Sequence, residues 1–264
     1  MSLENLFEKL WQQYSETNLQ ALQIHTLFKE RGEEVVNDHI AFRTFGLPKI
    51  NIEALAKFFK AYGYEEKGQY EFKAKKLRAK HYEKEGCPRV FISELKVEEF
   101  SDSLQKTLSK LIEQVGQSAL NDESLLYSGI VWNRISWPTY EKLKKESEYA
   151  SWLAVFGYVA NHFTVSVNEL KTFAGISEVN EFLKDNGFSL NVSGGEIKGT
   201  KEECLLQSST LASEIRTPLK ESEYVLPGCY YEFAERFDLP NGQLFNGFIA
   251  KSADKIFEST NFQD

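Results

Sequence analysis

The chain has little cysteine and no long apolar run. The first argues against a secreted fold held by disulfides, and the second against a membrane-spanning protein. Its 3 cysteines are widely separated and form no Cys-x-x-Cys pair: Cys87, Cys204 and Cys229. That pattern fits a reducing cytoplasm better than a disulfide-stabilised secreted fold. The most apolar segment, residues 152–160 (WLAVFGYVA), is far shorter than the ~20 residues that a membrane-spanning helix requires. The sequence therefore predicts a cytoplasmic protein without a membrane partner.

Positive charge is also scarce. The 264 residues carry 31 Lys and Arg against 39 Asp and Glu, a net charge of -8. This balance argues against nucleic acid or an anionic membrane surface as a partner. An anionic small molecule would have to be held by cations placed locally. Residues 1–16 contain acids and a helical apolar rhythm, so they predict an amphipathic helix and not a signal peptide.

Two segments of the chain, residues 33–96 and 156–250, share one predicted β-α-β-β-β order. In the first, a strand, a helix, a hairpin and a strand are expected at 37–45, 50–64, 69–86 and 88–95. In the second, a strand, a helix, a hairpin and two strands are expected at 158–168, 177–188, 189–199, 203–213 and 228–237. Helices are expected at residues 3–31 and between the modules, at 97–155.

The two modules also align in register. DHIAF at 38–42 matches NHFTV at 161–165, and FKAYGY matches LKDNGF at nearly the same offset. We therefore predict an α+β fold in which residues 1–264 form a single domain, with additional N-terminal and inter-module helices. Tandem β-α-β-β-β modules resemble the vicinal-oxygen-chelate fold, in which paired modules curl into a cup around one metal ion.

His39 and His162 take the same position in the first strand of each module, and the chain has only 4 histidines. Equivalent positions of a pseudo-twofold fold converge on its axis, so we expect the two imidazoles to be neighbours and metal ligands. Side chains alternate along a strand, so Arg43 shares the face of His39. It is suited to hold a substrate carboxylate through two hydrogen bonds, or to form a salt bridge with a nearby acid.

A third ligand is expected from the last strand. Glu232 lies between Tyr231 and Phe233, and a buried carboxylate needs a partner or a metal. Glu235, next to Arg236, is expected to be solvated. Two imidazoles and one carboxylate with open coordination positions suit non-haem Fe(II), with Zn(II) as the main chemical alternative.

Four polar side chains are weaker pocket candidates: Thr164, Ser166, Gln207 and Ser209. The first two share the face of His162, and the other two share one face of the strand at 203–213. These polar faces could equally be solvated. The basic hairpin at 73–85 (KAKKLRAKHYEKE), with His81, is expected to be a solvated face, or else a positive rim that attracts an anionic substrate.

At NDHIAFRTF, VANHFTV and YYEFAER the chain resembles the 2-oxoadipate dioxygenase/decarboxylase family, also called hydroxyglutarate synthase, over roughly residues 30 to 250. The resemblance implies Fe(II) on His39, His162 and Glu232, with Arg43 binding the substrate. It also implies conversion of 2-oxoadipate and O2 to 2-hydroxyglutarate and CO2 in lysine breakdown. The chain is shorter than the characterised members.

Two other functions fit the same residues. One is a lyase, isomerase or hydrolase of the same fold that uses Zn(II), Ni(II) or Mn(II). The other is a protein that binds a small ligand without turning it over. Metal analysis would separate the proposed oxygenase from the first, and oxygen consumption would separate it from the binding protein. The sequence leaves the oligomeric state open.

Overall fold

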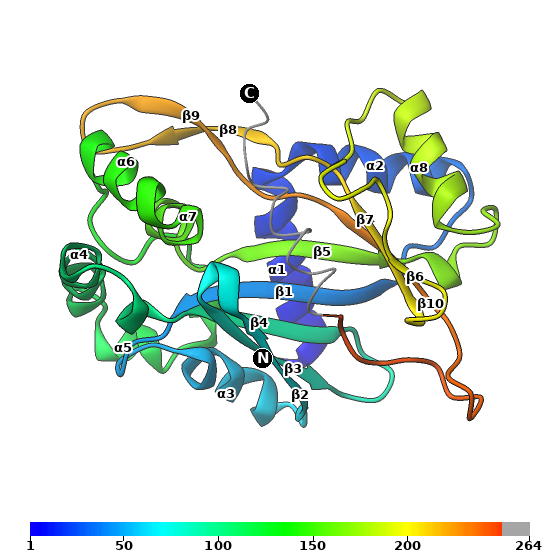
Figure 1. Cartoon of the computed structure of the whole chain (residues 1–264), viewed down its shortest axis with the longest axis horizontal. Coiled ribbons are helices and arrows are strands. Elements are labelled where there is room, and N and C mark those ends of the chain that lie inside the picture. The colour runs from blue at the N-terminus through cyan, green and yellow to red at the C-terminus, as the bar shows by residue number, and fades with distance from the viewer. Residues whose placement is uncertain (250–264) are drawn as a thin grey trace.

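Eight strands form one mixed sheet within residues 1–249, which the computed structural model of this chain describes. They are β1 (Asn37–Phe45), β2 (Glu65–Phe72), β3 (Leu77–Glu83), β4 (Arg89–Leu95), β5 (Ala160–Ser166), β6 (Lys198–Thr200), β7 (Leu205–Ser209) and β10 (Glu232–Arg236). Their order across the sheet is β2-β3-β4-β1-β5-β10-β7-β6 (Figure 1). The sheet is curled, and we call its concave side the cup.

The sheet has an internal pseudo-twofold arrangement. Its central strands, β1 and β5, pair antiparallel. On one side β4 pairs parallel with β1, and on the other side β10 pairs parallel with β5. The outer strands continue this symmetry, since β3 and β7 run antiparallel to β4 and β10. The predicted element order of the first module is confirmed, and the first strands of both modules meet at the centre of the sheet.

Eight α-helices surround the sheet within the described residues. They are α1 (Leu3–Thr17), α2 (Leu19–Glu30), α3 (Ile52–Ala61), α4 (Asp102–Glu113), α5 (Gln117–Leu120), α6 (Trp137–Glu146), α7 (Glu148–Phe156) and α8 (Ile176–Asp185). The predicted N-terminal and inter-module helices are therefore present. Local signals set their ends: the Ser147 hydroxyl accepts a hydrogen bond from the Ala150 N–H at 3.1 Å and caps α7.

Helices α1 and α2 cover the convex face of the sheet. The ring of Phe163 on β5 packs edge-on against Trp11 of α1 at 5.2 Å, and Phe233 on β10 packs against Phe28 of α2 at 6.1 Å. Phe163 and Phe233 directly follow His162 and Glu232, and neighbouring strand residues point to opposite faces. Burying the phenylalanines against the helices therefore directs the histidine and the glutamate into the cup.

The second module differs from its prediction in two places. The hairpin expected at 189–199 is wrong: residues 198–200 pair instead with β7, and Leu190 contributes an isolated bridge to Thr210. Gly194 and Gly195 both have positive φ, 72° and 102°, so the backbone turns away from an extended course there. The predicted strands at 203–213 and 228–237 are present but shorter, as β7 and β10.

A second sheet was not predicted. It consists of β8 (Glu214–Pro218) and β9 (Glu223–Pro227), which pair antiparallel between β7 and β10 in the chain. The ring of Tyr224 on β9 stacks on Trp137 of α6 at 4.3 Å, so the hairpin is held by an inter-module helix. This contact joins segments that lie far apart in the sequence.

Residue 250, the predicted end of the second module, and residues 251–264 of the predicted single domain lie outside the described residues. In the part that is described, no helix has the length and apolar character needed to cross a bilayer.

Candidate metal centre

Three buried side chains from three adjacent strands meet in the cup. His39 on β1, His162 on β5 and Glu232 at the start of β10 place their candidate ligand atoms within 4.8 Å of one another. His39 Nε2 lies 3.6 Å from Glu232 Oε1, and His162 Nε2 lies 3.3 Å from Glu232 Oε2. The two imidazole rings are 5.5 Å apart. The sequence therefore correctly predicted that these residues are neighbours.

The protonation states of these groups suit a cation. Burial lowers the pKa of His39, and burial together with the nearby His39 lowers the pKa of His162 well below its ordinary value. Both imidazoles are therefore neutral and able to donate a lone pair. Burial raises the pKa of Glu232 to about 8, and its Oε2 accepts no hydrogen bond from the described residues. A bound metal ion would stabilise the ionised carboxylate of Glu232. Two neutral imidazoles and this carboxylate therefore form a set of ligands that fits a divalent metal ion.

Hydrogen bonds to the far side of each ligand fix its orientation. His39 Nδ1 lies 2.7 Å from Asp38 Oδ2, and His162 Nδ1 lies 3.1 Å from Asn161 Oδ1. Both contacts place the Nδ1 proton outward and leave Nε2 facing the centre. Gln207, predicted as a pocket residue, donates from Nε2 to Glu232 Oε1 at 2.6 Å.

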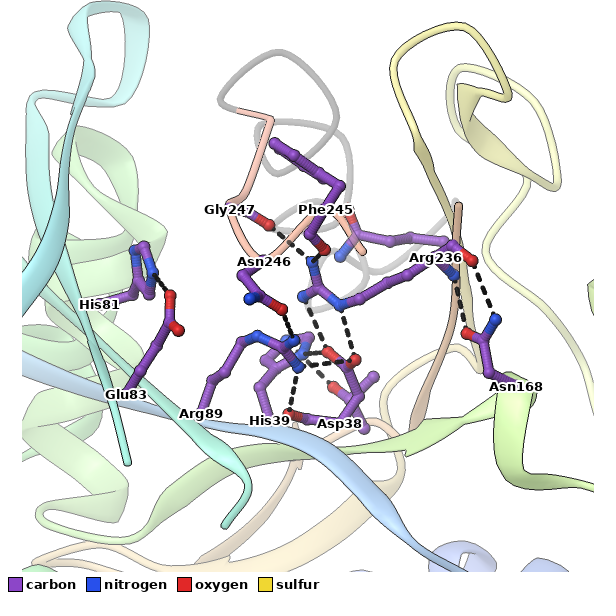
Figure 2. A network of polar contacts seen from close by, with 12 residues as sticks. Asp38, His39, His81, Glu83, Arg89, Asn168, Arg236, Phe245, Asn246 and Gly247 are labelled. Carbon is purple, nitrogen blue, oxygen red and sulfur yellow. Dashed lines mark hydrogen bonds and ion pairs between the residues drawn. The ribbon is translucent and has the colours of Figure 1, made fainter. Parts of the chain in front are cut away.

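Two arginines hold Asp38 (Figure 2). Arg236 donates from Nε to Asp38 Oδ1 at 2.6 Å and from Nη2 to Oδ2 at 2.9 Å, and Arg89 donates to Oδ1 at 3.2 Å. Burial alone would raise the pKa of Asp38, but the Arg236 charge and the His39 hydrogen bond hold it well below its ordinary value. The sequence analysis missed this pair, although an acid directly before a ligand histidine was a signal for it.

Arg236 also fastens residues 245–248, which we call the covering segment, over the cup (Figure 2). Its Nη1 donates to the backbone oxygens of Phe245 at 3.0 Å and Gly247 at 2.8 Å. The Phe248 ring then packs edge-on against His39 at 4.8 Å, and its N–H donates to the Tyr70 hydroxyl at 3.1 Å. One arginine therefore supports both the ligand's partner and the cover of the site.

A cavity surrounds the candidate ligands, and we call it the metal cavity. Its lining combines polar and aromatic side chains: His39, Ala41, Phe42, Arg43, Phe91, Ser93, Asn161, His162, Gln207, Tyr230, Glu232 and Phe248. The guanidinium of Arg43 lies 5.1 Å from the Tyr149 ring centre and 4.7 Å from that of Trp152. This stacking against α7 holds a cation beside the ligands.

The other predicted residues have mixed placements. The Thr164 hydroxyl lies 3.1 Å from His39 Nε2. Ser166 and Ser209 are buried, but neither is among the described residues that line the metal cavity. Glu235, expected to be solvated, is half-buried, and its Oε2 accepts from the Ile176 N–H at 2.9 Å at the start of α8.

The solvated position expected for His81 is also wrong. Its side chain is buried between the Tyr70 hydroxyl at 2.9 Å and Glu83 Oε1 at 2.8 Å, and its ring lies 5.3 Å from Phe248. The charged neighbours of His81 in the sequence hid this, because alternate residues of β3 point outward.

Comparison with known proteins gives the family. A family model described as 2-oxoadipate dioxygenase/decarboxylase matches residues 4–245. The chain is 38% identical over 255 residues to the 2-oxoadipate dioxygenase/decarboxylase of Oryza sativa subsp. japonica, covering 87% of this chain and 70% of the rice protein.

Two solved structures are also similar. One is the hydroxyglutarate synthase of Oryza sativa in complex with 2-oxoadipate, with TM-score 0.92 and 35% identity, covering 97% of this chain and 91% of the other. The other is a protein of Shewanella frigidimarina NCIMB 400 that was named as a hydrolase. Its TM-score is 0.90 and its identity 47%, and the match covers 94% of this chain and 98% of the other.

Proposed function

The chain belongs to the 2-oxoadipate dioxygenase/decarboxylase family, and we propose from this premise that it converts 2-oxoadipate and O2 to 2-hydroxyglutarate and CO2. The reaction balances without a further reductant, because both atoms of O2 enter the hydroxy acid: one completes the new carboxylate at the former keto carbon and the other becomes the hydroxyl, while CO2 leaves with the oxygens of the substrate's own carboxylate. The similarity to the rice enzymes supports this substrate.

We propose that His39, His162 and Glu232 hold Fe(II). Two neutral imidazoles and one carboxylate are the donor set that non-haem Fe(II) oxygenases use, with positions left open for other ligands. When bound, the ferrous ion supplies the redox chemistry by which O2 reacts with a 2-oxo acid. The observation that carries this proposal is that three buried ligand atoms within 4.8 Å of one another share a cavity with an arginine.

The surrounding residues then have separate tasks. Arg43 binds the distal carboxylate of the substrate by charge-assisted hydrogen bonds. Asp38 keeps the Nδ1 proton on His39, and Gln207 orients Glu232. Phe248 and Tyr230 are aromatic walls of the cavity and limit the access of water to the reacting groups. Thr164 and Ser166 on β5 and Ser209 on β7 are buried polar residues of the strands next to the cavity.

Oxygen consumption tests the proposal. The protein is loaded with Fe(II) without air, mixed with 2-oxo dicarboxylic acids of different lengths, and followed with an oxygen electrode. We expect 2-oxoadipate to give equal amounts of CO2 and 2-hydroxyglutarate. Protein loaded with Zn(II) is the control and should consume no O2. Turnover with Zn(II), or none with Fe(II), would favour a hydrolase, lyase or binding protein instead.

We further propose that the chain acts as a single domain in the cytoplasm. Its three cysteines are free thiols, which is compatible with a reducing compartment.

A further inference from the structure

A second cleft, of roughly 390 Å³, opens beside the metal cavity. One wall is the tip of the β2–β3 hairpin, including Lys75 and Lys76, and the opposite wall runs from the end of α6 into α7, including Lys144 and Lys145. These two walls come from segments about 70 residues apart. The tip of the basic hairpin run therefore lines this cleft, although no residue of the run lines the metal cavity.

The side chains that line this second cleft, which we call the lysine cleft, are mainly positively charged. It is lined by four lysines and Arg43 against two acids, Glu146 and Glu148. Glu146 is already engaged, since it accepts hydrogen bonds from the Ser101 N–H at 3.3 Å and hydroxyl at 2.8 Å. Lys76 is held at the rim, where it donates to the Glu99 backbone oxygen at 2.6 Å. In a chain of net charge -8 such a local excess of cations stands out.

Arg43 connects the lysine cleft with the metal cavity, because it lines both. Its side chain is buried, and its guanidinium lies over the rings of Tyr149 and Trp152. Tyr149 also lines the lysine cleft, and it is fixed by hydrogen bonds to the backbone of Thr44 on β1. An anion drawn in by the surface lysines would thus meet a rigidly placed guanidinium at the floor.

We propose that the lysine cleft is the entrance through which the dianionic substrate reaches the metal cavity. The proposal rests on the proposed function and adds the route and the residues that attract the substrate. A cleft lined by one sign of charge raises the local concentration of an oppositely charged ligand and its rate of association. This effect grows with the ligand's charge and weakens with salt, because Lys75 and Lys145 are at the surface.

Charge reversal at the rim tests this. The double variant Lys75→Glu/Lys145→Glu changes the net charge by four units at the cleft, whereas Lys106→Glu/Lys110→Glu makes the same change on exposed lysines of α4 that do not line it. We expect kcat/KM for 2-oxoadipate at low salt to fall about tenfold in the cleft variant and less than about twofold in the control. The difference should largely vanish at about 0.5 M salt.

Ligand charge gives a second readout. The attraction enters as a Boltzmann factor in the charge, so a tenfold loss for a dianion corresponds to a loss of about threefold for 2-oxohexanoate, a monoanion. The KM for O2 should not change. Binding of 2-oxoadipate to the Fe(II) protein without air, measured by calorimetry, should weaken with the same salt dependence.

Equal losses in the cleft and control variants, or equal losses for dianion and monoanion, would overturn the proposed entrance while leaving the reaction intact. If the unmodified protein binds 2-oxoadipate but consumes no O2 with it, the proposed reaction is wrong. The calorimetric comparison of the cleft and control variants then still tests the proposed entrance. If it does not bind 2-oxoadipate at any salt concentration, both proposals are overturned.

Discussion

Asp38 and Arg236 form a buried, two-bonded ion pair although 198 residues separate them in the sequence. The pair fixes one side of His39, and the same guanidinium holds the covering segment over the cup. Removing one member of a buried ion pair leaves the charge of the other uncompensated. Without Arg236, Arg89 would compensate only part of the negative charge of Asp38, through its single hydrogen bond to Oδ1.

We therefore expect Arg236→Met to lower the free energy of unfolding by about 3 kcal/mol or more. Asp38→Asn should lower metal affinity by about 10-fold to 100-fold, since it weakens the hold on the His39 tautomer. Urea unfolding and metal titration against a chelator measure the two effects. Lys29→Met on the surface of α2 is the control and should change neither. Normal metal affinity in a folded Asp38→Asn protein would show that the pair serves the fold alone.

Glu232 and Glu235 offer a matched comparison of carboxylates on one strand. We expect Glu232→Gln to abolish metal retention, because the neutral amide removes the anionic ligand. Glu235→Gln should retain the metal, since its side chain points to α8 and an amide oxygen can still accept from Ile176. Metal content after gel filtration measures both. The reverse result would mean that Glu235 is the ligand.

Arg43 should select the substrate and take no part in binding the metal, because a guanidinium keeps its proton and offers no lone pair. We expect Arg43→Ala to keep Fe(II) and to lower kcat/KM for 2-oxoadipate by about tenfold to more than a hundredfold, the loss of a charge-assisted contact. A 2-oxo acid without the distal carboxylate should lose much less. Equal losses for both substrates would assign Arg43 to the fold or to the oxygen chemistry.

Phe248 covers His39 and lines the metal cavity, whereas Phe245 in the same segment does not line it. We expect Phe248→Ala to speed the removal of metal by a chelator severalfold and to increase hydrogen exchange at residues 245–248, because a buried ring is lost. Phe245→Ala is the matched control and should change the chelation rate less. Equal chelation rates in Phe248→Ala and the unmodified protein would show that the ring does not protect the site.

Glu33 gives a pH-dependent test of stability away from the metal. Its carboxylate accepts from the N–H groups of Lys171 at 2.8 Å and Thr172 at 2.6 Å, and from the Thr172 hydroxyl. Burial opposes ionisation, but these hydrogen bonds lower the pKa of Glu33 below its ordinary value. A lowered pKa in the folded state stabilises the protein at pH values above the ordinary carboxyl range, and this contribution is lost as the pH falls through the folded value.

We therefore expect Glu33→Gln to cost on the order of 1.5–3 kcal/mol near neutral pH. The difference from the unmodified protein should shrink as the pH drops below the ordinary pKa of a glutamic acid. Urea unfolding at a series of pH values measures this. A cost that does not change with pH would mean that the amide fails for geometric reasons and not through lost charge.

The sequence by itself determined the elements that depend on neighbouring residues. Helical apolar rhythm located the helices, and the strand period of two placed His39 and Arg43 on one face. The repeat of DHIAF as NHFTV put His39 and His162 in equivalent positions, and a sheet with β1 and β5 at its centre brings such positions together. The choice of Glu232 as a candidate ligand came from its aromatic neighbours, which correctly indicated that it is buried.

Only the tertiary structure decided which distant side chains complete the site. Asp38 could have paired with any nearby cation, and the pairing with Arg236 exists because β10 lies beside β5 in the sheet. The position of Phe248 over His39 and the placement of Lys75 and Lys145 along one cleft depend in the same way on how non-adjacent segments pack. Residue spacing carries no record of such contacts, since they arise from strand order and from the path of the connecting segments.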